Sequence, residues 1–375
     1  MALVKPDTTR LAKIKVLGIG GGGGNALNSM ISQNKISGVE FIAVNTDAQV
    51  LLANQSPTKV QIGEKLTRGL GVGGDPGLGR QAAEESKDKI KELLIDADMV
   101  FITAGMGGGT GTGAAPVIAQ IARETGALTV AIMTKPFAFE GTKRAVVAED
   151  GIEAMKDKVD TLIVIPNQKL MDVIDRKVTL LDAFRVVDSV LNQGVQGISE
   201  IITVPGLINV DFADVKTVMK DAGSALLGIG TGVGEARAQM AARAAISSPL
   251  LDLSIEGAKG VLFNISGGHD LTMVEVDEAA HIISEHCDAD ANIIFGATID
   301  HKLSDQVRIT VIATGFDETR ARLAQMTQQQ QPQPVVSPEG LVSESPQQEE
   351  KELPPIENDE FGERFEIPAF LRQGR

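Results

Sequence analysis

The segment GMGGGTGTGAAP, residues 105–116, constrains the fold more than any other part of the chain. It follows the apolar run DMVFITA and precedes the helical pattern AAPVIAQIARE, so we expect a turn between a buried strand and a helix. Glycines let backbone N–H groups approach a ligand closely, and a helix N-terminus attracts anions. The segment therefore predicts a loop around a nucleotide's phosphates, with hydroxyl donors from Thr110 and Thr112.

Two further glycine-rich segments follow or lie between predicted strands, at residues 18–25 and 71–74. The first, GIGGGGGN, satisfies GxGxxG, and Asp47 ends the next strand where a dinucleotide fold places its ribose-binding acid. An NAD-binding oxidoreductase is therefore one alternative. Three glycine loops at one sheet edge suit a triphosphate better, and the chain has no GxxxxGK[ST] motif. Backbone amides and Mg²⁺ would then hold the phosphates.

Composition excludes several other classes of function. The formal net charge of -15 argues against broad contact with nucleic acid or anionic lipid. With no Trp and no Tyr, the chain has few platforms on which bases could stack. Cys287 is the single cysteine, and no apolar run reaches the roughly 20 residues that span a bilayer. We expect a cytoplasmic protein without a structural metal, since His281, His286 and Cys287 do not share one helical face.

The apolar periodicity predicts two α/β units. Over residues 11–178 the runs IKVLGI, FIAVN, DMVFITA, LTVAIMT and TLIVIP alternate with helical patterns, which indicates a mostly parallel sheet with helices on both faces. Residues 179–203 keep an apolar stripe at helical spacing and predict a long central helix. Residues 204–316 form a second unit, with helices near 213–222 and 235–246 and strands GVLFNIS, NIIFGAT and RITVIAT.

Both ends of the chain differ in composition from these units. Residues 1–10 are polar and patternless, and we expect a mobile arm. Residues 317–360 are rich in Gln, Pro, Ser and Glu and predict a disordered acidic linker, because they cannot bury enough apolar surface. Residues 361–375, FGERFEIPAFLRQGR, regain apolar and basic side chains and predict a peptide that binds a partner protein. Direct lipid binding is disfavoured in so acidic a context.

The GGGTGTG of residues 107–113 is the tubulin-type nucleotide signature. With the other segments, the chain resembles the FtsZ family of tubulin-like GTPases from about residue 11 to 316, and again in its last residues. The resemblance implies a Rossmann-like GTP-binding domain, joined by the central helix to a smaller, GTPase-activating α/β domain. It also implies GTP, GDP and Mg²⁺ as ligands. The implied function is head-to-tail assembly into the cytokinetic Z ring, beneath the inner membrane at the bacterial midcell.

The same resemblance assigns roles around the nucleoside. Glu140 and Arg144 would hold the ribose region, while Asn167, Phe184 and Asp188 would cover and hydrogen-bond the guanine. A carboxylate suits guanine, whose N1–H and amino group are paired donors that adenine lacks. Without the resemblance, Asp188 is one polar residue on a solvated helix face, and Glu140 with Arg144 is a surface ion pair. The expected nucleotide contacts are Gly21, Gly22, Gly23, Gly24, Asn25, Gly71, Gly107, Gly108, Gly109, Thr110, Gly111, Thr112, Glu140, Arg144, Asn167, Phe184 and Asp188.

The segment GLINVDFADVK, residues 206–216, holds the candidate catalytic residues Asn209, Asp211 and Asp214. The residues alone favour a simpler interpretation, in which acids cap a helix and complement its dipole. In the FtsZ family the corresponding loop enters the nucleotide site of the next subunit, so the resemblance implies hydrolysis between two molecules. If the loop is only a cap, the chain is a scaffold that senses GTP without hydrolysing it.

The last predicted motif is EIPAFLR near the C-terminus, which resembles the FtsZ family's tail peptide. That peptide docks on membrane-tethering adaptors and division regulators. The three residues of this chain that follow the motif, Gln373, Gly374 and Arg375, depart from the more basic endings of some relatives. The expected partner contacts are Ile367, Pro368, Phe370, Leu371 and Arg372.

Overall fold

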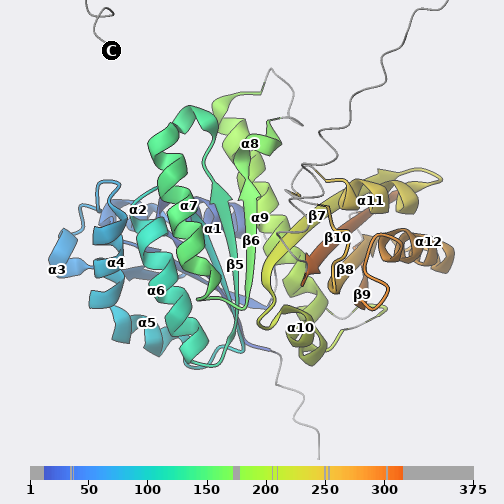
Figure 1. Ribbon diagram of the computed structural model, residues 1–375, viewed down its shortest axis with the longest axis horizontal. Helices are drawn as coiled ribbons and strands as arrows, with labels where there is room; N and C mark the ends of the chain where they lie inside the picture. Colours follow the sequence, from blue (N-terminus) through green and yellow to red (C-terminus); the bar gives the residue numbers. More distant parts are fainter. Residues whose placement is uncertain are drawn as a thin grey trace, which may run out of the picture. The chain divides into compact units, whose positions relative to one another are not determined.

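The computed structural model describes residues 12–33, 36, 38–171, 178–204, 206–208, 210–248, 251, 254–300 and 303–315. Within these residues a 10-stranded sheet has the order β3-β2-β1-β4-β5-β6-β7-β10-β8-β9 (Figure 1). The predicted N-terminal arm, acidic linker and tail peptide lie outside the described residues.

The first six strands are all parallel to their neighbours. Their order, 3-2-1-4-5-6, is that of a doubly wound nucleotide-binding sheet. This confirms the predicted Rossmann-like sheet. The strands are β1 (Ile14–Ile19), β2 (Val39–Asn45), β3 (Thr58–Gln61), β4 (Met99–Gly105), β5 (Leu128–Lys135) and β6 (Thr161–Pro166).

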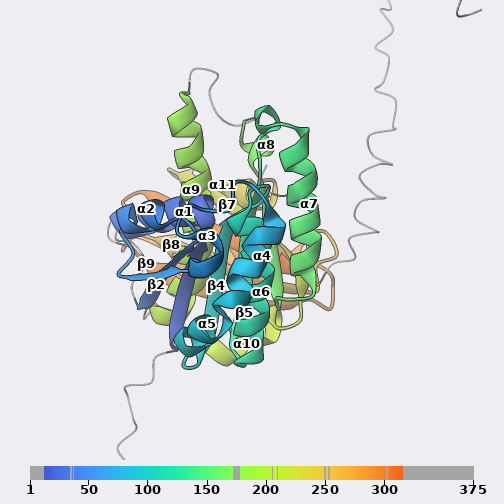
Figure 2. The ribbon, with the colours of Figure 1, turned by 90° about the vertical axis from the view of Figure 1, so that its left-hand side faces the viewer.

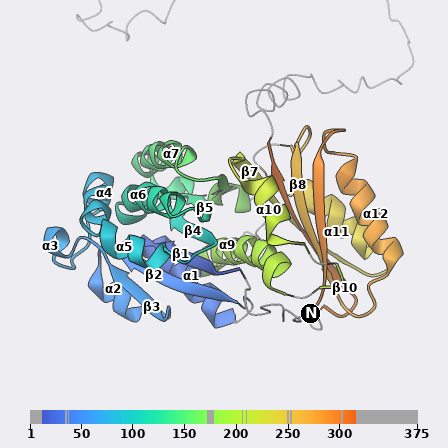
Figure 3. The ribbon, with the colours of Figure 1, turned by 90° about the horizontal axis from the view of Figure 1, so that it is seen from below.

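Helices cover both faces of this sheet, as Figures 2 and 3 show. Alternate strand residues point to opposite faces, so Phe101 packs in the core beneath α1 and α9, while Ile102 packs beneath α4 to α7. The two layers are α1 (Gly20–Gln33) and α9 (Leu180–Thr203), and α4 (Pro76–Glu85), α5 (Lys87–Leu94), α6 (Thr110–Glu124) and α7 (Thr142–Lys156). Short elements are α2 (Ala48–Ala53), α3 (Glu64–Thr67), the 3₁₀ turn η1 (Ala138–Glu140) and α8 (Asn167–Leu170).

The second unit continues the same sheet. β6 and β7 pair in parallel only over residues 161–163 and 223–225, and β10 is antiparallel to both β7 and β8. Helices α11 and α12 pack on one face of this part of the sheet. Helix α10 packs on the other face, in the same hydrophobic core as α9. The elements are α10 (Phe212–Met219), β7 (Gly223–Val233), α11 (Arg237–Ile246), β8 (Gly260–Gly267), α12 (Met273–Ser284), β9 (Asn292–Ile299) and β10 (Gln306–Thr314).

The predicted central helix is confirmed, with Thr179 as its N-cap and its hydroxyl accepting from the Asp182 amide at 3.2 Å. Two strands were not predicted. β3 has four residues at the sheet edge, and β7, GSALLGIGTGV, is interrupted by glycines. A Cβ on Gly230 would lie 1.9 Å from the carbonyl oxygen of Ala241, because α11 packs directly on the backbone of β7. The domain boundaries drawn from the sequence stay predictions.

Candidate functional site

A cavity of about 640 Å³ opens at the carboxyl ends of the parallel strands. This is the sheet edge at which doubly wound folds bind ligands, and the volume suits a small molecule. All three predicted glycine loops contribute to its wall. The expected residues that line it are Gly21, Gly22, Asn25, Gly71, Gly108, Gly109, Thr110, Gly111, Glu140, Arg144, Asn167, Phe184 and Asp188.

The glycine loops pack backbone against backbone. Gly20 has φ 73° where β1 turns into α1, and a Cβ there would lie 2.9 Å from the amide nitrogen of Gly111. A Cβ on Gly109 would lie 2.5 Å from Cγ2 of Val72. Because Thr110 then opens α6, the first N–H groups of that helix have no intrahelical partner. The loop thus combines close approach with a helix N-terminus, which suits an anion.

Four expected contacts do not line the cavity among the described residues: Gly23, Gly24, Gly107 and Thr112. Gly23 packs α1 on β4, since a Cβ there would lie 2.4 Å from the carbonyl oxygen of Thr103. The hydroxyl of Thr112 is buried and accepts from the Gly107 amide at 3.0 Å. The structure therefore places Thr112 behind the loop, as a brace of its conformation.

The wall at the other end of the cavity is partly aromatic. Phe184 of α9 meets Phe137 edge-on, with ring centroids 5.4 Å apart, and Phe137 stacks on Phe139 at 5.1 Å. Glu140 and Arg144 pair with each other at 2.5 Å, as the simpler interpretation predicted, and both face the cavity. Of these rings Phe184 lines the cavity, and an aromatic ring beside an ion pair suits a base and a sugar.

Two polar side chains of this wall are poised for a ligand. Asn167 is 4% exposed, and its Oδ1 has no hydrogen-bond partner among the described residues. A buried acceptor without a partner carries a free-energy cost that a ligand donor would relieve. Burial also raises the pKa of the Asp188 carboxyl to about 6. Asp188 is therefore part of the cavity wall and not of a solvated helix face.

The sequence reasoning missed several polar residues of the cavity. Asn45 ends β2 and Thr46 follows it directly, and the Thr46 hydroxyl lies 2.7 Å from that of Thr110. The signal was available, since polar residues after a parallel strand face the ligand edge. Asp47 also lines the cavity, but its carboxylate caps α2 by accepting from the amides of Gln49 at 2.9 Å and Val50 at 3.1 Å. Asp47, the residue that would bind the ribose in a dinucleotide site, is thus already engaged in capping α2.

The candidate catalytic acids lie elsewhere. Asp211 and Asp214 begin α10, and Figure 1 places α10 at the end of the sheet opposite the carboxyl ends of β5 and β6. Asp188 and α10 are separated by the remaining length of α9, which is about 22 Å at 1.5 Å per residue. Asn209 lies outside the described residues.

The helix-cap interpretation of these acids is only half supported. Asp211 occupies the N-cap position of α10, yet its side chain makes no capping hydrogen bond. Both carboxylates are exposed, and neither has a hydrogen-bond or ion-pair partner in the part of the chain that the structure describes. Their charges are available to another molecule.

Glycine loops at the carboxyl edge of a doubly wound parallel sheet define a nucleotide-binding α/β protein. Residues 13–175 match the GTPase domain of the Tubulin/FtsZ family, and residues 223–317 match the C-terminal domain of the FtsZ family. The chain therefore belongs to the FtsZ family of tubulin-like GTPases, and it is a GTPase.

Solved structures agree with this assignment. An empty FtsZ dimer from M. jannaschii is 48% identical, with a TM-score of 0.79, and the match covers 82% of this chain and 89% of that chain. A point mutant of FtsZ from the same organism is 49% identical, with a TM-score of 0.78 and coverage of 81% and 91%. CetZ2 from Haloferax volcanii, a GTPgS-bound protofilament, shares the fold at 21% identity, with a TM-score of 0.70 and coverage of 84% and 99%.

Proposed function

We propose that the chain binds GTP with Mg²⁺ and assembles head-to-tail into filaments of the Z ring at the bacterial division site. Hydrolysis takes place where two subunits meet, and GDP loosens the contact. One observation carries the proposal: the glycine-loop cavity lies at one end of α9, and α10, which begins with the exposed acids Asp211 and Asp214, lies at the other. Stacking subunits along α9 would bring the acids of one to the cavity of the next.

The positions of the cavity's own carboxylates support the proposal that the catalytic acids come from a neighbouring subunit. Asp47 caps α2, Glu140 pairs with Arg144, and Asp188 lies beside Phe184 at the aromatic end. None of these is free to polarise a water at the phosphate loops. The acids that a neighbour would supply are exposed and have no partner among the described residues, as a general base or a water-orienting group requires.

Exposed apolar side chains at the two ends support a contact between subunits. Leu70, which lines the cavity, is 83% exposed, and Phe139, which directly precedes the cavity residue Glu140, is 61% exposed. Leu207, in the segment that leads to Asp211, is 69% exposed and its backbone amide is held by Ala297 at 2.9 Å. Burying such side chains between subunits would add to stability by about 25 cal/mol for each Å² removed from water.

The donor set fits Mg²⁺ carried in with the nucleotide. The cavity offers the hydroxyls of Thr46 and Thr110 near the phosphate loops, and the described residues hold no cluster of three or more His, Cys, Asp or Glu. Mg²⁺ keeps waters and favours phosphate oxygens, so it needs few protein ligands. When bound, it would neutralise charge on the phosphates.

The tail peptide extends the proposal to partners and location. Ile367, Pro368, Phe370, Leu371 and Arg372 would bind a membrane-tethering adaptor and division regulators, which would hold the filament in the cytoplasm beneath the inner membrane. No described helix is long and apolar enough to cross a bilayer. Binding of an isolated tail peptide by the adaptor, lost with Phe370→Ala, would test this step.

The first test of the shared site measures phosphate release from GTP with Mg²⁺ over a series of protein concentrations, with light scattering in parallel. We expect negligible turnover below a threshold and a rise that follows scattering. Turnover per molecule that is independent of concentration would mean a self-contained nucleotidase. No turnover in folded protein that binds GTP would instead favour a scaffold.

The second test mixes two variants, each of which should hydrolyse GTP slowly or not at all by itself. Asp214→Ala keeps its cavity and should bind GTP and assemble while hydrolysing slowly. Gly108→Asp keeps its acids, and the added carboxylate should repel phosphate without a clash, because no atom lies within 4 Å of a Cβ there. Mixing them should restore turnover, since one supplies the cavity and the other the acid. Normal turnover by Asp214→Ala alone, or none from the mixture, would contradict the shared site.

A further inference from the structure

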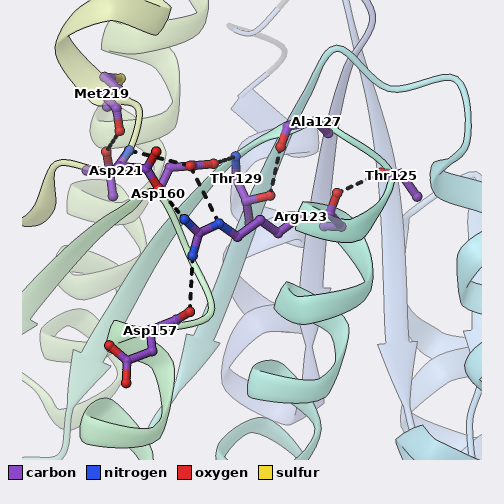
Figure 4. Close-up of polar contacts among 10 residues, drawn as sticks. Arg123, Thr125, Ala127, Thr129, Asp157, Asp160, Met219 and Asp221 are labelled. Atoms are coloured by element: carbon purple, nitrogen blue, oxygen red, sulfur yellow. Dashed lines mark hydrogen bonds and ion pairs between the residues drawn. The ribbon is translucent and has the colours of Figure 1, made fainter.

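A cluster of charged and polar residues connects the end of α6 to the turn between α10 and β7 (Figure 4). Arg123 lies in the last turn of α6, and Asp221 lies between the end of α10 and the start of β7. Asp160 lies between them, one residue before β6. The cluster thus joins a helix of the nucleotide cavity to the helix that carries the exposed acids.

Asp160 is the buried centre of the cluster, with 4% of its surface exposed. Its carboxylate accepts from the amides of Thr129 at 2.8 Å and Asp221 at 3.4 Å, and Nε of Arg123 lies 3.8 Å away. A buried carboxylate is tolerated only when it is paired and hydrogen-bonded. Asp160 therefore fixes the first residues of β5 and the turn after α10 in one arrangement.

Arg123 closes the cluster from the side of α6. Its guanidinium donates to the carbonyl oxygen of Asp157 at 3.1 Å and forms a close ion pair with Asp221. Asp221 has φ 51°, a left-handed conformation that residues other than glycine adopt rarely. On the α10 side, the Thr161 hydroxyl donates to the carbonyl oxygen of Met219 at 2.5 Å. The turn that ends α10 is thus held from both sides.

The two helices that the cluster connects carry the two halves of the proposed reaction. α6 has 15 residues, about 22 Å in length, and runs from Thr110 in the cavity wall to Arg123. α10 has eight residues, with Asp211 and Asp214 at its start and the Arg123-bound turn at its end. A shift of α10 by about 1 Å would misplace the acids enough to lower a rate by up to about 100-fold.

We propose that Arg123 is a positioning residue for GTP hydrolysis, which it serves by holding Asp221 against Asp160 and so fixing α10. The acids of one subunit are then presented in a single orientation to the cavity of the next. The proposal rests on the proposed function, in which those acids act across the subunit contact. Arg123 itself does not line the cavity, so it should leave GTP binding unchanged.

The variant Arg123→Gln removes the charge and keeps much of the side chain. We expect unchanged GTP affinity, assembly by light scattering and sedimentation, and turnover per polymerised subunit that is about tenfold lower. Asp221→Asn should cause a similar loss. The double variant should be no worse than either single variant, because both remove one ion pair. Arg123→Lys should retain part of the turnover.

A mixing experiment assigns the effect to one subunit. Arg123→Gln is added either to Gly108→Asp, which supplies acids, or to Asp214→Ala, which supplies the cavity. Turnover of the mixture should fall only when Arg123→Gln is in the acid-supplying subunit. An equal fall in both placements would mean a general structural role and overturn the proposal, as would no fall in either.

Two controls separate the possible failures. Arg80→Gln removes an exposed arginine that pairs with Glu84 on α4, away from the cluster, and should leave turnover unchanged. If the parental mixture of Gly108→Asp with Asp214→Ala is inactive, the shared site itself is wrong and the positioning role falls with it. If that mixture is active and Arg123→Gln does not change its turnover, only the positioning role is wrong. Should Arg123→Gln fail to fold, Asp221→Asn serves in its place.

Discussion

In α9, the cavity wall takes the carboxylate of Asp188 partly out of water, and burial raises its pKa to about 6. The folded chain then binds this proton more tightly than the unfolded chain does. As pH falls from 7 to 5, protonation of Asp188 should stabilise the nucleotide-free protein. The same protonation removes the acceptor that we assign to guanine's N1–H and amino group.

GTP affinity should therefore weaken as the free protein becomes more stable. We expect the dissociation constant for GTP to rise about tenfold between pH 7 and pH 5. At pH 5, one unit below the pKa of Asp188, only about a tenth of the free protein keeps the ionised carboxylate that binds guanine. Asp188→Asn should bind GTP more weakly at pH 7 and lose this pH dependence. Titration of each variant by calorimetry measures both effects. Asp182→Asn is the matched control, since Asp182 lies on the same helix and pairs with Arg185 outside the cavity.

At this scale the sequence predicted some residues and not others. The place of Gly108 to Thr110 in a loop at the cavity wall was predictable from the glycine run itself, while their contact with phosphate stays a prediction. Asp188 was not predictable from its helix alone, since its chemistry depends on burial by elements far away in the chain. Thr112 shows the converse, because a hydroxyl beside a phosphate loop can turn inward to brace it.

Elements were predictable where one periodicity dominated. β4 and β5 are almost wholly buried and read as apolar runs, and α9 keeps its stripe over 24 residues. β7 escaped prediction because its glycines serve the packing of α11, a contact between backbones that leaves no apolar pattern. The glycines of that strand are explained only by the steric clash that a side chain at their positions would cause.

This packing gives a prediction for β7. Gly230→Ala should destabilise the protein by about 3 kcal/mol, the upper end for overpacking, because the new Cβ would lie 1.9 Å from the carbonyl oxygen of Ala241. Thr231→Ala, at the next and exposed position, should cost less than about 1 kcal/mol. Urea unfolding followed by circular dichroism gives both values. Equal effects at the two positions would show that α11 does not pack on bare backbone.

At the scale of the whole molecule, the apolar periodicity predicted two units, and the structure joins them more closely than that pattern suggests. β6 and β7 extend one sheet across the boundary. A single buried cluster contains Ile132 of β5, Ile198 of α9, and Leu262 and Ile312 of the second unit. Loss of either unit would expose apolar surface of the other, so we expect the two to unfold together.

Cys287 gives a local probe of this coupling, because it is the single cysteine and lies half-buried in the second unit. Burial raises its pKa, so thiol labelling should be slow while the unit is folded. For the first unit, Ala119→Cys in a Cys287→Ser background places a thiol in the buried face of α6. In urea both thiols should become reactive at one midpoint, which should coincide with the loss of helical signal. Separate midpoints would mean that the shared cluster does not couple the units, and that α10 can move against the nucleotide cavity without unfolding either of them.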